Sequence, residues 1–206
     1  MELFFCILGW LFTGVFFLLF IILAWRSNLL RDEINNPAAF MTNAANWNIR
    51  YKGMAYEQIP RPFSLARTQF AVWTVVVAPV YLYHLLCAGC KLPLANSTTP
   101  LLLLIISAGT TAIATIIDKK NGRARSTTPR HQNGPSQGFV YDILADRCGI
   151  SIHRLQYVVW TLVLILVYLA RAASAGCVLP EMGGTLLALN GISSAVYLGL
   201  KIYENK

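Results

Sequence analysis

Charged residues are scarce in this chain of 206 residues. Asp, Glu, Lys and Arg together make up 13% of the sequence, whereas a soluble domain typically carries about a quarter. Acidic residues are fewer than basic ones, nine against 17, and histidine occurs three times. No Ser-His-Asp set, no paired carboxylates within an apolar stretch and no phosphate-binding glycine-rich loop stands out. These absences argue against an enzyme and against a bound cofactor.

Long apolar runs take the place of charge. The chain is 56% hydrophobic, with a mean hydropathy of +0.53. A helix needs about 20 apolar residues to cross a hydrocarbon core of roughly 30 Å. Five stretches meet or nearly meet that length: 3–25, 68–88, 100–117, 156–175 and 184–202. The sequence therefore predicts an all-α integral membrane protein with five transmembrane helices. The first stretch is too long for a signal peptide and has no basic start, so we expect a retained helix.

The basic residues are unequally divided between the two ends of these helices. Of the 17 lysines and arginines, all but Lys91 and Arg171 fall within 26–67, 119–154 or 201–206. Because cytoplasmic loops carry an excess of Lys and Arg, this predicts an N-terminus outside and a C-terminus in the cytoplasm. Anionic lipid headgroups are the expected partner of these loops, so the net charge of +8 does not call for nucleic acid.

Two stretches of the chain are nearly identical: RTQFAVWT at 67–74 and RLQYVVWT at 154–161. At the same offset, AGCKLP at 88–93 matches AGCVLP at 175–180. Both copies begin a membrane helix from the same side. The pattern therefore predicts two parallel two-helix repeats, related by an axis along the membrane normal.

The repeats divide the chain into five predicted segments. These are an N-terminal transmembrane helix (1–30), a cytoplasmic or interfacial segment (31–63), repeat 1 (64–117), a cytoplasmic linker with an interfacial helix (118–150), and repeat 2 (151–206). The linker is rich in Gly, Pro, Ser, Thr and basic residues, which is typical of flexible chain. In its interfacial helix, we expect one apolar side, and an opposite side carrying Asp142 and Asp146. The apolar side holds Phe139, Val140, Ile143 and Leu144.

Each repeat opens with the same three polar or aromatic side chains, Arg67, Gln69 and Trp73 in the first and Arg154, Gln156 and Trp160 in the second. Gln and Trp are four residues apart, so they share a helix face. We expect interface anchors, with Arg reaching the headgroups and Trp in the aromatic belt. The alternative is that the paired arginines bind an acidic lipid or partner.

Small and hydroxylated residues mark the returning helix of each repeat, Ser107, Thr111 and Thr115 in the first and Asn190 and Ser194 in the second. Such spacing lets helices approach closely and hydrogen-bond, which makes helix packing the expected role. A hydrated pathway is the alternative, although the first stripe covers only about 12 Å. Asn190 lies near the middle of its span and should face protein or water, because an amide facing lipid is costly.

The cysteines allow several arrangements. Cys90 and Cys177 occupy matching positions in the two repeats, so a disulfide between the two outer turns is one possibility. His84, Cys87, Cys90 and Cys177 could on paper supply four ligands to a metal, but no second ligand pair has matching spacing. We therefore expect unlinked thiols and no metal.

Several blocks resemble a group of bacterial multi-pass membrane proteins. They are SLARTQFAVW at 64–73, GFVYDILADRCGISIHRLQYVVWTLVL at 138–164 and GISSAVYLG at 191–199. The resemblance covers most of residues 60–202 and not the first helix. It implies a bacterial source and the two-repeat organisation, and it implies no activity. We therefore expect a multi-pass protein of the bacterial cytoplasmic (inner) membrane.

Two functions are compatible with these features. The first is a non-enzymatic membrane protein that forms homo-oligomers and docks a soluble partner through its basic cytoplasmic face. Long inner segments and short outer turns favour it. The alternative is a homo-oligomeric channel for ions or small solutes, lined by the third and fifth helices.

Overall fold

The computed structural model describes residues 2–34, 36–86, 98–122, 134–146, 149–174 and 179–204. Within these ranges, five helices are long and apolar enough to cross a membrane. They are α1 (Glu2–Arg26), α3 (Leu65–Leu86), α4 (Thr99–Gly122), α6 (Ile152–Ser174) and α7 (Gly184–Glu204). The prediction of a mostly helical chain with five candidate membrane-spanning helices is thus confirmed, with boundaries shifted by a few residues.

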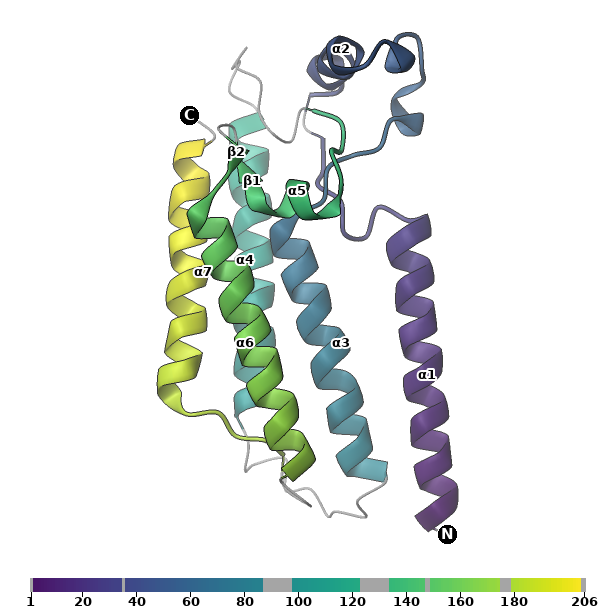
Figure 1. The fold of residues 1–206 in the computed structure, drawn as a ribbon, viewed down its shortest axis with the longest axis vertical. Helices are drawn as coiled ribbons and strands as arrows, with labels where there is room; N and C mark the ends of the chain where they lie inside the picture. Colours follow the sequence, from purple (N-terminus) through teal and green to yellow (C-terminus); the bar gives the residue numbers. More distant parts are fainter. Residues whose placement is uncertain are drawn as a thin grey trace.

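Helices α3, α4, α6 and α7 form a bundle, and α1 stands beside it in contact with α3 (Figure 1). Helices α3 and α6 run in one direction and α4 and α7 return, so the two helical hairpins have the same orientation (Figure 1). Most side chains of α1 are exposed. This exposure suits a helix whose surroundings are lipid, because acyl chains are as apolar as its side chains.

The bundle interior contains two apolar clusters. The first core cluster lies where α3 and α6 begin and consists of Leu65, Ala66, Ala114, Ile143, Tyr157 and Tyr197. The second core cluster lies deeper along the same helices and consists of Trp73, Val77, Leu103, Leu164, Tyr168 and Met182. Polar side chains separate the two clusters.

The segment after α1 forms a small folded unit at one end of the bundle. It contains α2 (Pro37–Trp47) and the short 3-10 helices η1 (Ile49–Tyr51) and η2 (Tyr56–Gln58). The side chain of Asn36 accepts a hydrogen bond from the Ala39 amide, and Pro37 occupies the first helical turn, both typical of a helix start. Phe40, Ala44 and Ile59 give the segment a core of its own. We call residues 36–63 the α2 unit.

The predicted interfacial helix differs from expectation. Helix α5 (Phe139–Leu144) has only six residues and leads into an antiparallel hairpin of β1 (Ala145–Asp146) and β2 (Gly149–Ile150). Asp142, which we expected on the polar surface, is fully buried, whereas Phe139 and Val140 are exposed. The amphipathic assignment of Asp142 is therefore wrong. The physical reason is a set of hydrogen bonds from distant residues, described next.

Candidate functional site

The carboxylate of Asp142 joins α5 to the α2 unit. Its Oδ2 accepts hydrogen bonds from the Phe63 amide at 3.1 Å and the Ser136 hydroxyl at 2.6 Å, and its Oδ1 accepts one from the Gln137 amide at 2.9 Å. The Ser136 amide in turn donates to the carbonyl of Pro60 at 2.8 Å. Hydrogen bonds to a carboxylate are roughly twice as strong as neutral ones and offset its burial. Segments 79 residues apart in sequence are thereby held together.

Arginines reinforce this joint. The guanidinium of Arg31 lies 4.2 Å from the centre of the Phe63 ring and donates to the Arg61 carbonyl. Arg61 stacks on Tyr56, with its guanidinium 5.0 Å from the ring centre. Burial lowers the pKa of Arg31, while the negative charge of Asp142 opposes that shift. An arginine remains charged under such a change, so the cation–π contact persists.

The α2 unit exposes a mixed apolar and basic surface. The side chains of Trp47 and Ile49 are 60% and 81% exposed, and Arg50 and Lys52, which follow in the same short run of sequence, are also exposed. We call these four residues the Trp47–Lys52 surface. Sequence reasoning missed it, although the run NWNIRYK carries the signal: two large apolar residues among polar and basic ones, outside any membrane span.

A layer of polar side chains crosses the bundle between the two core clusters. The hydroxyl of Thr161 on α6 donates to the side-chain carbonyl of Gln69 on α3 at 2.7 Å. Ser194 on α7 donates to the phenolic oxygen of Tyr157 on α6 at 2.9 Å. Tyr157 on α6 therefore lies level with Ser194 on α7. Because α6 and α7 are antiparallel, the residues one helical turn deeper in the bundle, Thr161 on α6 and Asn190 on α7, also lie level with each other. Asn190 is 1% exposed, and neither polar atom of its side-chain amide has a hydrogen-bond partner among the described residues.

A buried ion pair joins α4 and α7 near the end that carries the α2 unit. Lys201 Nζ lies 2.8 Å from Asp118 Oδ2, and the two side chains are 3% and 10% exposed. The ring of Tyr197 lies beside the pair, with Lys201 Nζ and the Arg154 guanidinium 5.9 and 5.7 Å from its centre. No local pattern in the sequence indicates this pair, because its members are 83 residues apart and neither belongs to a motif.

The predicted interface anchors occupy unequal positions in the two repeats. Arg67 forms a 2.9 Å ion pair with Glu33 at the surface, where such a contact contributes little stability. Gln69 and Trp73 are buried, and Trp73 belongs to the second core cluster rather than to the protein surface. In the second copy the pattern of burial is reversed. Arg154 is buried, Gln156 is exposed and Trp160 is half-buried.

The predicted packing residues of α4 are satisfied mainly within their own helix. Ser107 donates to the Leu103 carbonyl and Thr115 to the Thr111 carbonyl, both at 2.8 Å. Thr111 also approaches the Ala66 carbonyl of α3 at 3.0 Å. These short polar side chains allow α3 and α4 to lie close together.

The predicted disulfide residues Cys90 and Cys177 lie outside the described residues, as does Cys87. His84, the remaining member of that run, is buried in α3, with Nδ1 2.8 Å from the Val80 carbonyl. The geometry of His84 is therefore that of a side chain bonded to its own helix.

Comparison with known proteins returned no match among protein-family models, curated proteins or solved structures. The resemblance of residues 60–202 to a group of bacterial membrane proteins thus stays a prediction. A function for this chain has to be argued from the arrangement of its own residues.

Proposed function

We propose that this protein is a non-enzymatic membrane platform that forms homo-oligomers and docks a soluble partner on its basic cytoplasmic end. The observation that carries the proposal is the Trp47–Lys52 surface, which leaves two large apolar side chains exposed beside two cations. Interface centres are enriched in Trp and Arg, and an exposed apolar patch outside the membrane typically marks an interaction site. The basic rim suits a partner with an acidic surface.

The distribution of charge supports the orientation. Among the lysines and arginines of the described ranges, all except Arg171 lie at the end of the bundle where α3 and α6 begin (Figure 1). We assign that end to the cytoplasm, with the N-terminus outside and the C-terminus inside, in a bacterial inner membrane. The equal direction of the α3–α4 and α6–α7 hairpins supports two parallel repeats.

A docking surface is effective only if it is held in place. The hydrogen bonds of Asp142 fix the α2 unit to the segment that leads into α6, so the surface is mounted on the bundle rather than on a loose tail. Because the surface is already ordered before binding, the binding of a partner there costs this chain little conformational entropy.

A photoreactive amino acid at position 49 tests the docking proposal in intact cells. We expect one cross-linked protein product, reduced at least fivefold when Arg50→Glu and Lys52→Glu are combined. Ile150 provides the control site, because it is 66% exposed at the same end of the protein but belongs to β2. Lipid adducts at position 49, or the same protein product from position 150, would contradict the proposal.

Orientation and self-association need separate measurements. Thiol labelling of an introduced Glu57→Cys, at an exposed position of the α2 unit, should fail from outside the cell, and labelling from outside would overturn the assigned topology. Native mass spectrometry of the purified protein should give a multiple of the 22.9 kDa chain mass. A monomer at all concentrations would remove the homo-oligomer from the proposal.

The alternative, a homo-oligomeric channel lined by α4 and α7, has one supporting observation. The unpartnered amide of Asn190 is the kind of group that binds water inside a helix bundle. Ser107, Asn190 and Ser194 are, however, buried within one protomer rather than exposed for a shared pore. Ion flux into liposomes that contain the protein, abolished by Asn190→Leu with assembly intact, would favour the channel over the platform.

A further inference from the structure

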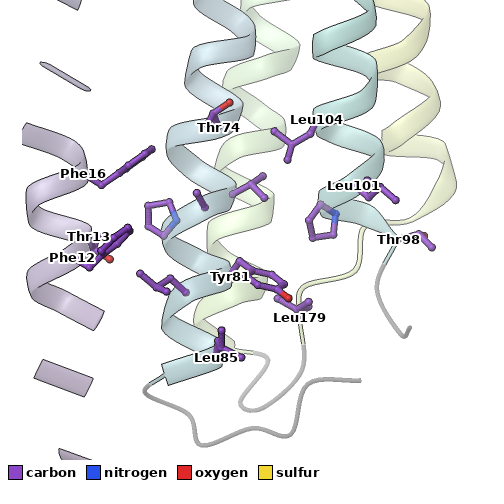
Figure 2. A pocket seen from close by; sticks show the side chains of 15 residues that line it. Phe12, Thr13, Phe16, Thr74, Tyr81, Leu85, Thr98, Leu101, Leu104 and Leu179 are labelled. Carbon is purple, nitrogen blue, oxygen red and sulfur yellow. The ribbon is translucent and has the colours of Figure 1, made fainter. Parts of the chain in front are cut away.

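Helix α1 contacts α3 but leaves an apolar groove along one side of the contact. The groove has a volume of about 690 Å³ and is bounded by α1, α3 and α4 (Figure 2). Phe12 and Phe16 of α1 form one wall, and Leu101 and Leu104 of α4 form the other (Figure 2). The volume falls in the range of roughly 300–1,000 Å³ that small-molecule sites occupy.

Small side chains on α3 keep this groove open. Ala78 and Pro79 contribute to its floor, and Ala78 is exposed. Thr74, at its inner end, donates its hydroxyl to the Phe70 carbonyl at 2.9 Å, so its proton is already bonded within the helix. A polar metabolite would find few groups to bind here, whereas a hydrocarbon chain would match the lining.

The groove has the depth of one membrane leaflet. Its α3 lining runs from Thr74 to Leu85, which at 1.5 Å per residue is about 16 Å. That is about half of a hydrocarbon core of roughly 30 Å. Thr74 lies near the middle of α3, and Leu85 lies next to its end, so the groove starts at the membrane centre and extends to one surface.

We propose that the groove binds one acyl chain of a membrane glycerolipid from the leaflet at the α3 C-terminal end. The chain terminus lies near Thr74 and Leu104, and the ester end lies in the outer part of the groove, between the level of Thr98 and that of Leu85 (Figure 2). Tyr81 points into the outer part of the groove (Figure 2). Its hydroxyl is placed to donate to an ester carbonyl of the lipid.

Two alanines provide a matched test. Ala78 is nine residues beyond Gln69 on α3, and Ala170 is nine residues beyond Thr161 on α6. The Gln69–Thr161 hydrogen bond aligns these parallel helices, so both alanines lie at the same membrane depth. Both are exposed, but Ala170 does not line the groove. Ala78→Trp should fill the groove, while Ala170→Trp adds the same side chain to an open lipid-facing surface.

The full-length protein is reconstituted with a phospholipid that carries a diazirine at the end of one acyl chain. After irradiation, we expect adducts on the groove lining near Thr74 and Leu104. Ala78→Trp should reduce these adducts at least tenfold, and Ala170→Trp should leave them unchanged. Ala78→Leu, a smaller change, should give an intermediate loss and covers the case in which the Trp variant does not fold.

Three outcomes would overturn the proposal. One is equal labelling of the two Trp variants, which would indicate ordinary surrounding lipid. Another is labelling spread evenly over α1, α6 and α7. The third is cross-linking of two copies of this chain through the groove residues in place of lipid adducts, because a second protomer would then be the occupant.

Discussion

The ammonium of Lys201 on α7 lies 2.8 Å from the carboxylate of Asp118 on α4, in a position where both side chains are almost fully buried. Removing one partner of such a pair leaves an uncompensated charge in the interior. We expect Lys201→Met to lower the free energy of unfolding by about 3–5 kcal/mol. The double variant Lys201→Met with Asp118→Leu should recover most of that loss, because it removes both charges of the pair together. Unfolding curves in mild detergent provide the measurement, and equal stability of single and double variants would contradict the pairing.

The hydrogen bonds that Phe63, Ser136 and Gln137 donate to Asp142 should control whether the α2 unit stays attached. Asp142→Ala removes every acceptor, and hydrogen bonds to charged groups contribute about 1.5–3 kcal/mol each. We expect amide hydrogen exchange at Phe63 and Gln137 to accelerate at least tenfold, with no change in the middle of the spanning helices. Ser136→Ala should show a smaller effect because it removes one donor. Glu57→Ala, at an exposed position of the same unit, is the control and should change nothing.

Asn190 is expected to reduce stability rather than provide it. An unpaired buried amide costs about 1–3 kcal/mol, and leucine has a similar shape without polar atoms. Asn190→Leu should therefore raise the free energy of unfolding by about that amount. Ser194→Ala, one turn away, should lower it because the hydrogen bond to Tyr157 is lost. A clear loss of stability in Asn190→Leu would indicate that a bound water or ion satisfies the amide.

The two tryptophans of the repeated motif should respond unequally to truncation. Trp73→Ala leaves a cavity in the second core cluster and should cost about 3–5 kcal/mol. Trp160→Ala should cost less than half as much, since that side chain is only half-buried. Thermal unfolding of the two variants checks this order. Equal losses would mean that both copies of the motif use the same helix face.

The five candidate membrane helices follow from sequence alone, because apolarity over about 20 consecutive residues is a local property that a bilayer selects directly. Local reasoning was also sufficient to identify the end of the bundle that gathers the arginines and lysines. The face that each helix turns inward, in contrast, is not a local property of the sequence. Gln69 and Gln156 occupy equivalent places in the repeated motif, yet one is buried and the other exposed.

The tertiary structure decided the pairings between distant residues. Asp142 is buried because donors from Phe63 and Ser136 meet it, and no helical periodicity in 138–148 contains that information. The same holds for Lys201 with Asp118, and for the groove that Ala78 leaves open beneath Phe12 and Phe16. The sequence determined which segments are long and apolar enough to cross a membrane, since that depends on transfer free energy summed along the chain. Packing decided which polar groups meet, since that depends on helix register and rotation.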